Sequence, residues 1–98
     1  MDKVAFIKFV AAQGTVFSVT GVEYRIISVD ASLITGIRLS TKKPFEIRTE
    51  SLYRAYRDFV SQKELLTTKA LKPYVDRVQS PSLAILKVVF EKNETESS

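Results

Sequence analysis

Four short stretches of strand-like alternation, followed at once by an amphipathic helix, constrain the fold of this chain more than any other feature. The strand patterns cover residues 15–20, 23–30, 33–40 and 44–49, and the helical pattern covers 50–62. Only a few turn residues separate neighbouring strands, so consecutive strands should pair as hairpins. The sequence therefore predicts an antiparallel meander of three or four strands with one polar face.

Alternation within the strands also predicts which side chains face the core. The second strand brings its apolar residues to one face only if a β-bulge lies near Ile27–Ser28. In the third strand we expect the face that contains Leu39 to point inward, and Arg38 to point outward. The residues that we expect to be buried together are Ile37, Leu39, Phe45, Ile47, Leu52, Tyr56 and Phe59.

Capping signals predict a helix on each side of the strands. Asp2 can accept an early backbone N–H of a helix that ends near Gln13, and Gly14 suits the left-handed position after a helix. Thr49 has the same capping chemistry before the helix over 50–62. Both helices should pack on the sheet.

Two more helical patterns follow toward the C-terminus. The first can start at Thr67 or Thr68 and keeps helical spacing to Val78. Pro73 is tolerable only in the first turn of a helix, so we expect the regular part to begin near Lys72. The second is Pro81–Glu91, which Ser80 should cap and which is apolar nearly all round. Such a helix is usually buried between other elements, and the alternative is that one face binds a partner.

The expected fold class is therefore α+β. It consists of an N-terminal helix, the meander, and two or three C-terminal helices packed on one face. We expect residues 1–92 to form a single α+β domain and residues 93–98 to form a disordered polar tail.

The residue types that are missing exclude several kinds of chemistry. The 98 residues include no Cys and no His, so the chain can form no disulfide, thiolate metal site or histidine base. A metal-dependent nuclease would need Glu23, Asp30 and Glu46 to converge near a lysine, and no spacing supports that arrangement. We therefore expect no catalytic residues, no metal site and no cofactor.

No stretch of the sequence is predicted to enter a membrane. The apolar start of the chain is short and Lys8 interrupts it, which fits a helix of the fold better than a signal peptide. The apolar residues around Lys87 are too few to span a bilayer. We expect a cytoplasmic protein.

Positive charge is concentrated in the middle of the chain. The formal net charge is +4. Residues 38–72 hold nine Lys or Arg and four Asp or Glu, which gives this segment +5. A localised basic segment with aromatic residues among the charges can bind a phosphate backbone. The candidate nucleic-acid-binding residues are Arg38, Lys42, Lys43, Arg48, Tyr53, Arg54 and Arg57.

The same charges could also serve only to keep the protein soluble, and this interpretation stays open. Surface Lys and Arg often only solubilise a protein, and here Glu46, Glu50 and Asp58 could pair with some of them. Our first hypothesis is a small non-catalytic binding module that associates weakly, and without sequence preference, with nucleic acid. The alternative is a protein-interaction or homo-oligomerisation module, in which a sheet edge or the last helix forms a dimer.

Overall fold

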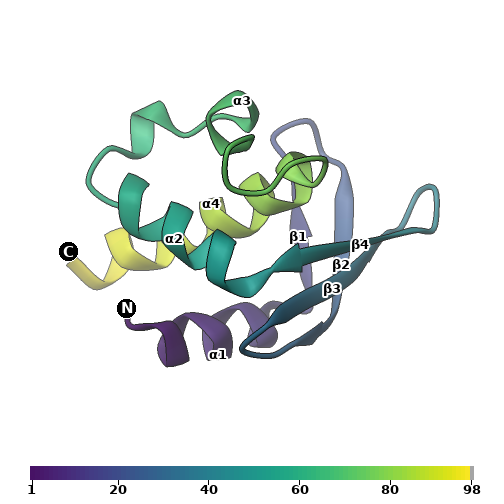
Figure 1. Ribbon diagram of the computed structural model, residues 1–98, viewed down its shortest axis with the longest axis horizontal. Helices are drawn as coiled ribbons and strands as arrows, with labels where there is room; N and C mark the ends of the chain where they lie inside the picture. The colour runs from purple at the N-terminus through teal and green to yellow at the C-terminus, as the bar shows by residue number, and fades with distance from the viewer. Residues whose placement is uncertain (98) are drawn as a thin grey trace.

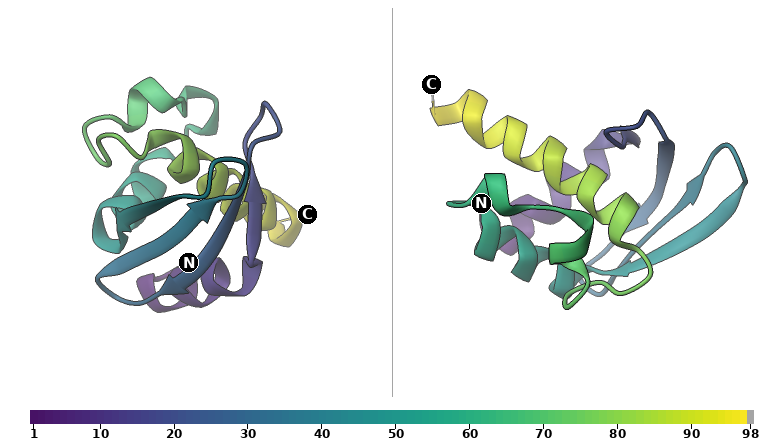
Figure 2. Two further views of the ribbon diagram at one scale, coloured as in Figure 1. Left: turned by 90° about the vertical axis from the view of Figure 1, so that its right-hand side faces the viewer. Right: turned by 90° about the horizontal axis from the view of Figure 1, so that it is seen from above.

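A four-stranded antiparallel sheet, covered by helices on one face, forms the centre of this chain in the computed structural model. The structure describes the backbone of residues 1–97 and the side chains of residues 1–92. Figures 1 and 2 show the helices gathered on one side of the sheet. The elements in chain order are α1 Lys3–Gln13, β1 Thr15–Phe17, β2 Glu23–Val29, β3 Leu33–Arg38, β4 Lys43–Arg48, α2 Thr49–Phe59, the 3-10 turn η1 Lys63–Leu65, α3 Thr68–Leu71 and α4 Gln79–Ser97.

The predicted fold class and the meander are confirmed. The strands pair in the order β1-β2-β3-β4, and every pairing is antiparallel. The register of β2 against β3 shifts between Ile26 and Ser28, where we predicted a bulge. The shift returns Val29 to the helix-covered side, where it packs against the core with Tyr24 and Ile26.

Helix α1 begins and ends as its sequence predicts. The Asp2 carboxylate accepts a hydrogen bond from the Ala5 backbone N–H at 2.8 Å, and Gly14 follows the helix with φ of 70°. Phe6 and Val10, one turn apart, are fully buried. These caps are decided within a few residues, which is why the sequence alone predicts them.

Strand β1 is shorter than the predicted 15–20. Its ladder ends at Phe17, because Ser18 turns the chain. The Ser18 backbone N–H donates to the carbonyl of Val22, and the Ser18 hydroxyl accepts from the Val22 N–H. Gly21, with φ of 87°, completes the turn.

The predicted inward face of β3 is wrong by one residue. Ile34 is fully buried and Gly36 is buried beside it, whereas Ile37 and Leu39 are half-buried on the opposite phase. Cross-strand pairing explains the choice, because Ile34 lies opposite Ile47 and Gly36 lies opposite Phe45. The phenylalanine ring fills the space over the glycine, so a residue without a side chain belongs to the inner face.

The other predicted core residues are confirmed. Phe45, Ile47, Leu52 and Tyr56 are buried, and Phe59 is half-buried against them. Helix α2 contacts β3 and β4, so the apolar stripe of the helix meets the inner face of the last hairpin. Thr49 does not cap α2, however. Its buried hydroxyl donates instead to the carbonyl oxygen of Asp30 at 2.8 Å.

The segment between α2 and α4 is less helical than predicted. Thr67 caps α3, with its hydroxyl accepting from the Ala70 N–H at 3.1 Å, but α3 ends at Leu71. Pro73 has no N–H with which to continue the helix. Leu71 and Val75 are nevertheless buried, so the turns that follow α3 still cover part of the core.

Helix α4 starts earlier than predicted. It begins at Gln79, and its first helical bond runs from the Ser82 N–H to the Val78 carbonyl at 3.1 Å, so Ser80 lies within the first turn and is not the cap. Pro81 precedes that first donor, so its missing N–H costs no helical bond. The backbone of α4 also continues past the predicted end at Glu91, as far as Ser97. The side chains of the segment 93–98 lie outside the described residues, and the predicted disordered tail stays a prediction.

The chain buries α4 without a partner. The helix packs against α1, α3 and β1, and Ala84, Ile85, Leu86 and Val89 are at most 1% exposed. The prediction that this helix is buried between other elements is therefore confirmed, and a homodimer stays a prediction. Among the described residues, no helix is both long enough and apolar enough to cross a membrane.

Candidate nucleic-acid interface

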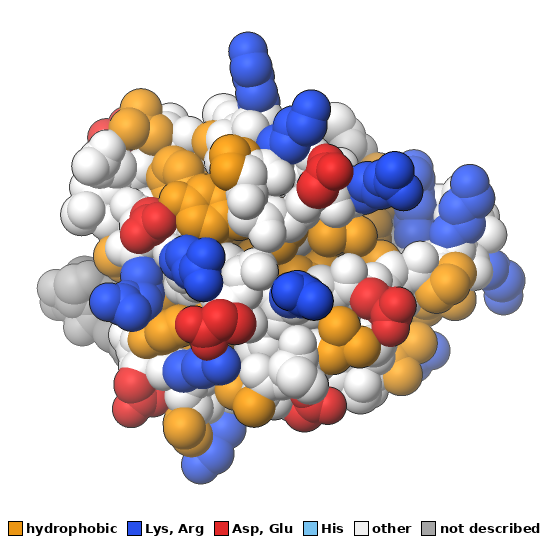
Figure 3. Space-filling view, viewed as in Figure 1, with side chains coloured by type: hydrophobic (Ala, Val, Ile, Leu, Met, Phe, Trp, Pro, Cys, Tyr) orange, Lys and Arg blue, Asp and Glu red, His pale blue; other side chains and the backbone are white. Residues whose placement is uncertain are grey.

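The turn between β3 and β4 brings two cations opposite each other. Lys42 occupies the left-handed region with φ of 59°, and its N–H donates to the Arg38 carbonyl at 2.7 Å. The strands that leave this turn place Arg38 directly across from Lys43. The hairpin projects from the molecule, and several Lys and Arg side chains gather at this end of it (Figures 1 and 3).

Arg38 lies on the helix side of the sheet, not on the outer face that we predicted. It continues the inner phase of Ile34 and Gly36, and it pairs with the buried Tyr24 of β2. Arg38 is the last residue of β3 and lies beyond the buried core. It is therefore exposed and can carry a charge although it faces the helix side. The one-residue error in the predicted inward face of β3 therefore explains why the predictions for both Leu39 and Arg38 were wrong.

A third cation reaches the same place from a distant part of the chain. Arg77 follows α3 in a loop and adopts a left-handed φ of 72°. Together with Arg38 and Lys43 it lines a groove of about 270 Å³, which we call the basic groove. Its lining residues are Tyr24, Arg38, Lys43, Pro44, Phe45, Arg77, Val78, Ser80 and Pro81.

Sequence patterns did not indicate Arg77 as a site residue, because helical spacing extended through Val78. Only the early end of α3 and the return of the chain toward β4 bring this residue to the groove. Lys42 and Arg77 are the two residues other than glycine with positive φ in the part of the chain that the structure describes. Both are basic, but only Arg77 lines the basic groove.

The electrostatics of the basic groove favour an anion. No Asp or Glu is among its lining residues, and Arg38, Lys43 and Arg77 have no ion-pair partner among the described side chains. Three positive charges line this groove with no carboxylate in the lining, an arrangement that favours binding of phosphate or carboxylate groups.

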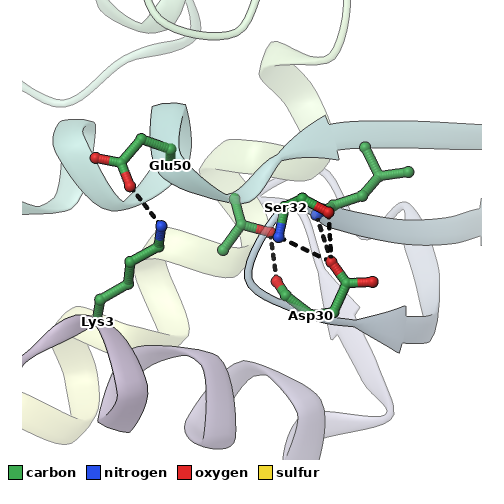
Figure 4. A network of polar contacts seen from close by, with 6 residues as sticks. Lys3, Asp30, Ser32 and Glu50 are labelled. Atoms are coloured by element: carbon green, nitrogen blue, oxygen red, sulfur yellow. Dashed lines mark hydrogen bonds and ion pairs between the residues drawn. The ribbon is translucent and has the colours of Figure 1, made fainter.

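The other predicted arginines lie elsewhere. Arg48 is on the outer face of β4, opposite Leu33, and is five residues from Lys43, roughly 17 Å along the strand. Arg54 and Arg57 are exposed on α2 and lie close enough to Glu50 to help lower its pKa. The larger cause of that lowered pKa is Lys3, whose ammonium contacts Glu50 at 2.5 Å (Figure 4).

Tyr53 packs against other aromatic rings and does not line the basic groove. Its half-buried ring contacts those of Phe6 and Tyr56, with centroid distances of 5.4 and 5.8 Å, and these two rings also contact each other. Its hydroxyl donates to the Met1 carbonyl at 3.1 Å. The aromatic residue of the predicted interface is thus part of the packing between α1 and α2.

A deeper cavity adjoins the basic groove. It measures about 260 Å³ and shares Tyr24, Arg38 and Ser80 with the groove. It lies between the β1–β2 turn and helix α4, and α3 contributes Thr68. We call it the side pocket. Its full lining is Ser18, Val19, Thr20, Val22, Tyr24, Arg38, Thr68, Ser80, Leu83, Ala84 and Lys87.

The carboxylates of the chain form no cluster in the described part. Among residues 1–92, no three acidic side chains gather closely enough to hold a metal ion. Asp30 serves its own loop, because its carboxylate accepts hydrogen bonds from the backbone N–H groups of Ser32 and Leu33, both at 2.8 Å (Figure 4). These bonds hold the pKa of Asp30 below its ordinary value.

Comparison with known proteins gives no relative from which a function could be carried over. No protein-family model, curated protein or solved structure matches the chain.

Proposed function

We propose that this chain is a non-catalytic nucleic-acid-binding module whose basic groove holds the phosphate backbone. The observation that carries the proposal is the convergence of Arg38, Lys43 and Arg77, from three separate segments, on one groove without a lining carboxylate. Charges that only solubilise a protein have no reason to converge, since like charges destabilise one another at close range.

The groove offers few groups that could hydrogen-bond to the edges of bases, so we expect binding mainly through phosphates. Three phosphate contacts should give a slope of log K against log salt of about −2 to −3, because each contact releases condensed counterions. Contacts to phosphate alone carry no sequence information. Binding should therefore be weak and indifferent to sequence, roughly 10⁻⁴–10⁻⁶ M at physiological salt.

The test is a fluorescence-anisotropy titration with labelled duplex and single-stranded oligonucleotides, first at low ionic strength and then with rising salt. Lys43→Ala and Arg38→Gln should each flatten the salt slope by about one unit. Arg54→Gln is the matched control, since it removes the same charge from an exposed position on α2 outside the groove. The proposal fails if neither oligonucleotide binds at low ionic strength, or if Arg54→Gln weakens binding as much as Arg38→Gln.

A second candidate function rests on the open face of the sheet. Phe17 and Ile27 are 57% and 64% exposed there, although each is large and apolar. The same face carries Arg25 and Glu46, so two copies related by a twofold axis could pair opposite charges across an apolar centre.

Sedimentation equilibrium tests this homodimer directly. The wild-type chain should self-associate as its concentration rises, and Ile27→Lys should keep it monomeric. A monomer at all concentrations would remove the candidate. The nucleic-acid titration is independent of this result, because the basic groove lies on the helix side of the sheet.

A further inference from the structure

The side pocket has the chemistry of a site for a flat, partly polar group. Val19, Val22, Leu83 and Ala84 supply apolar walls. The lining also includes hydroxyl groups and cations, among them Ser80 and Lys87. Apolar walls with a few polar groups at the edge are the usual composition of a ligand pocket.

The size of the pocket limits its occupant to one small group. Drug-sized ligands occupy cavities from about 300 Å³ upward. A volume of about 260 Å³ therefore suits one nucleobase, and not a stack of several. A base has apolar faces for the walls and hydrogen-bonding edges for the rim.

The nearness of the basic groove indicates what such a group would be attached to. Arg38 and Ser80 line both cavities, so the two are direct neighbours, and a ligand in one would lie beside a ligand in the other. An anion in the groove and a flat heterocycle in the pocket are the two parts of one nucleotide. Tyr53 lines neither cavity, and its half-buried ring packs against those of Phe6 and Tyr56.

We infer that the side pocket receives one unpaired base of a single strand whose phosphates lie in the basic groove. This inference rests on the proposed function and adds the form of nucleic acid that the site prefers. Bases of an intact duplex are stacked and paired, so a duplex could use the pocket only after one base had flipped out, which costs energy. A flexible single strand does not have that cost.

The deciding probes are two strands of equal length, about eight nucleotides each. One is an ordinary single-stranded DNA, and the other carries abasic sites at every position and so keeps the phosphates without the bases. The ordinary strand should bind about tenfold more tightly, in line with the contribution of one base contact. In amide NMR spectra of the ¹⁵N-labelled protein, the ordinary strand alone should shift Val22, Leu83 and Ala84.

A wall variant with a matched control separates the pocket from the groove. Leu83→Ser should reduce the affinity for the ordinary strand to that for the abasic strand. Val88→Ser changes another half-buried residue of α4 that does not line the pocket, and it should keep the tenfold difference. If Leu83→Ser does not fold, Val19→Ser serves instead, since Val19 is 72% exposed, with the exposed Val4 of α1 as its control.

The outcomes distinguish this inference from the function on which it rests. Equal affinity for both strands, with the expected salt slope, would contradict the proposed base site in the side pocket but not the proposed phosphate site in the basic groove. Absence of binding by either strand at low ionic strength would overturn both. A tenfold preference that Leu83→Ser or Val19→Ser removes and the controls retain would support the pocket.

Discussion

The hydroxyl of Thr49 donates a hydrogen bond to the backbone carbonyl of Asp30, 19 residues earlier in the chain, at an oxygen–oxygen distance of 2.8 Å. The Thr49 N–H donates to the neighbouring Ser32 carbonyl at 3.2 Å. Thr49 is fully buried, and it is the first residue of α2. The start of the helix is therefore fixed to the loop between β2 and β3 (Figure 4).

Loss of this contact should destabilise the fold without changing its shape. Thr49→Val keeps the volume and branching but leaves the Asp30 carbonyl without this donor, so the free energy of unfolding should fall by about 1–3 kcal/mol. Thr49→Ser keeps the hydroxyl and should retain more of the stability. Urea unfolding of the three proteins measures the difference, and a Thr49→Val variant as stable as the wild type would contradict the role of the bond.

The turn at Asp30 should make stability depend on pH on the acid side. Hydrogen bonds from the Ser32 and Leu33 N–H groups lower the pKa of Asp30 in the folded state. A lowered folded pKa adds stability above the unfolded pKa of about 3.9, and this stability is lost as the pH falls through the folded pKa. Denaturant unfolding of the wild type and of Asp30→Ala should be measured from pH 7 to pH 2. The difference between their free energies of unfolding should become smaller only at the acid end of this range. A constant difference would contradict this account.

The phase of β3 can be tested with two truncations on one strand segment. Ile34 is fully buried, whereas Leu39 is half-buried on the opposite phase. Ile34→Ala should lower the free energy of unfolding by about 2–5 kcal/mol. Leu39→Ala should cost distinctly less, because solvent already reaches part of that side chain. Equal losses for the two variants would indicate that the strand phase is different.

Gly36 should not tolerate even a methyl group. A Cβ at this position would lie 2.5 Å from the Arg25 carbonyl oxygen, and it would also overlap the ring of Phe45. Gly36→Ala should destabilise by about 1–3 kcal/mol, the usual cost of overpacking. A second change, Phe45→Leu, should relieve the clash with the ring but not the one with the backbone. A double-mutant cycle in thermal unfolding would therefore show partial rescue, and full rescue would contradict the backbone clash.

Arg77 should show opposite effects on stability and on binding. Its φ of 72° is costly for a residue with a Cβ. Arg77→Gly should leave the free energy of unfolding unchanged or raise it by up to about 1 kcal/mol, after allowing for the entropy of the unfolded chain. The same change removes a cation from the basic groove and should flatten the salt slope by about one unit. A clear loss of stability would mean that the side chain holds the loop in place.

Local sequence alone determined the parts of this protein that depend on neighbours in the chain. Asp2 caps α1 through a bond to a residue three positions away, and alternation with short turns predicts the meander and its bulge. The apolar stripe of α2 follows from helical spacing. Interactions of this range depend on little beyond the segment itself, so they can be read from the chain in order.

The tertiary structure decided the rest, because it depends on which groups compete for the same space. Phe45 packs over Gly36, and this pairing sets the inner phase of β3 and with it the position of Arg38. Thr49 bonds to a distant loop instead of capping its helix, because its hydroxyl is fully buried and the Asp30 carbonyl supplies the acceptor that it needs. Arg77 reaches the basic groove only because α3 ends before Pro73 and the chain returns to the sheet. The sequence could therefore predict a basic character for this protein, but only long-range packing could choose which cations meet.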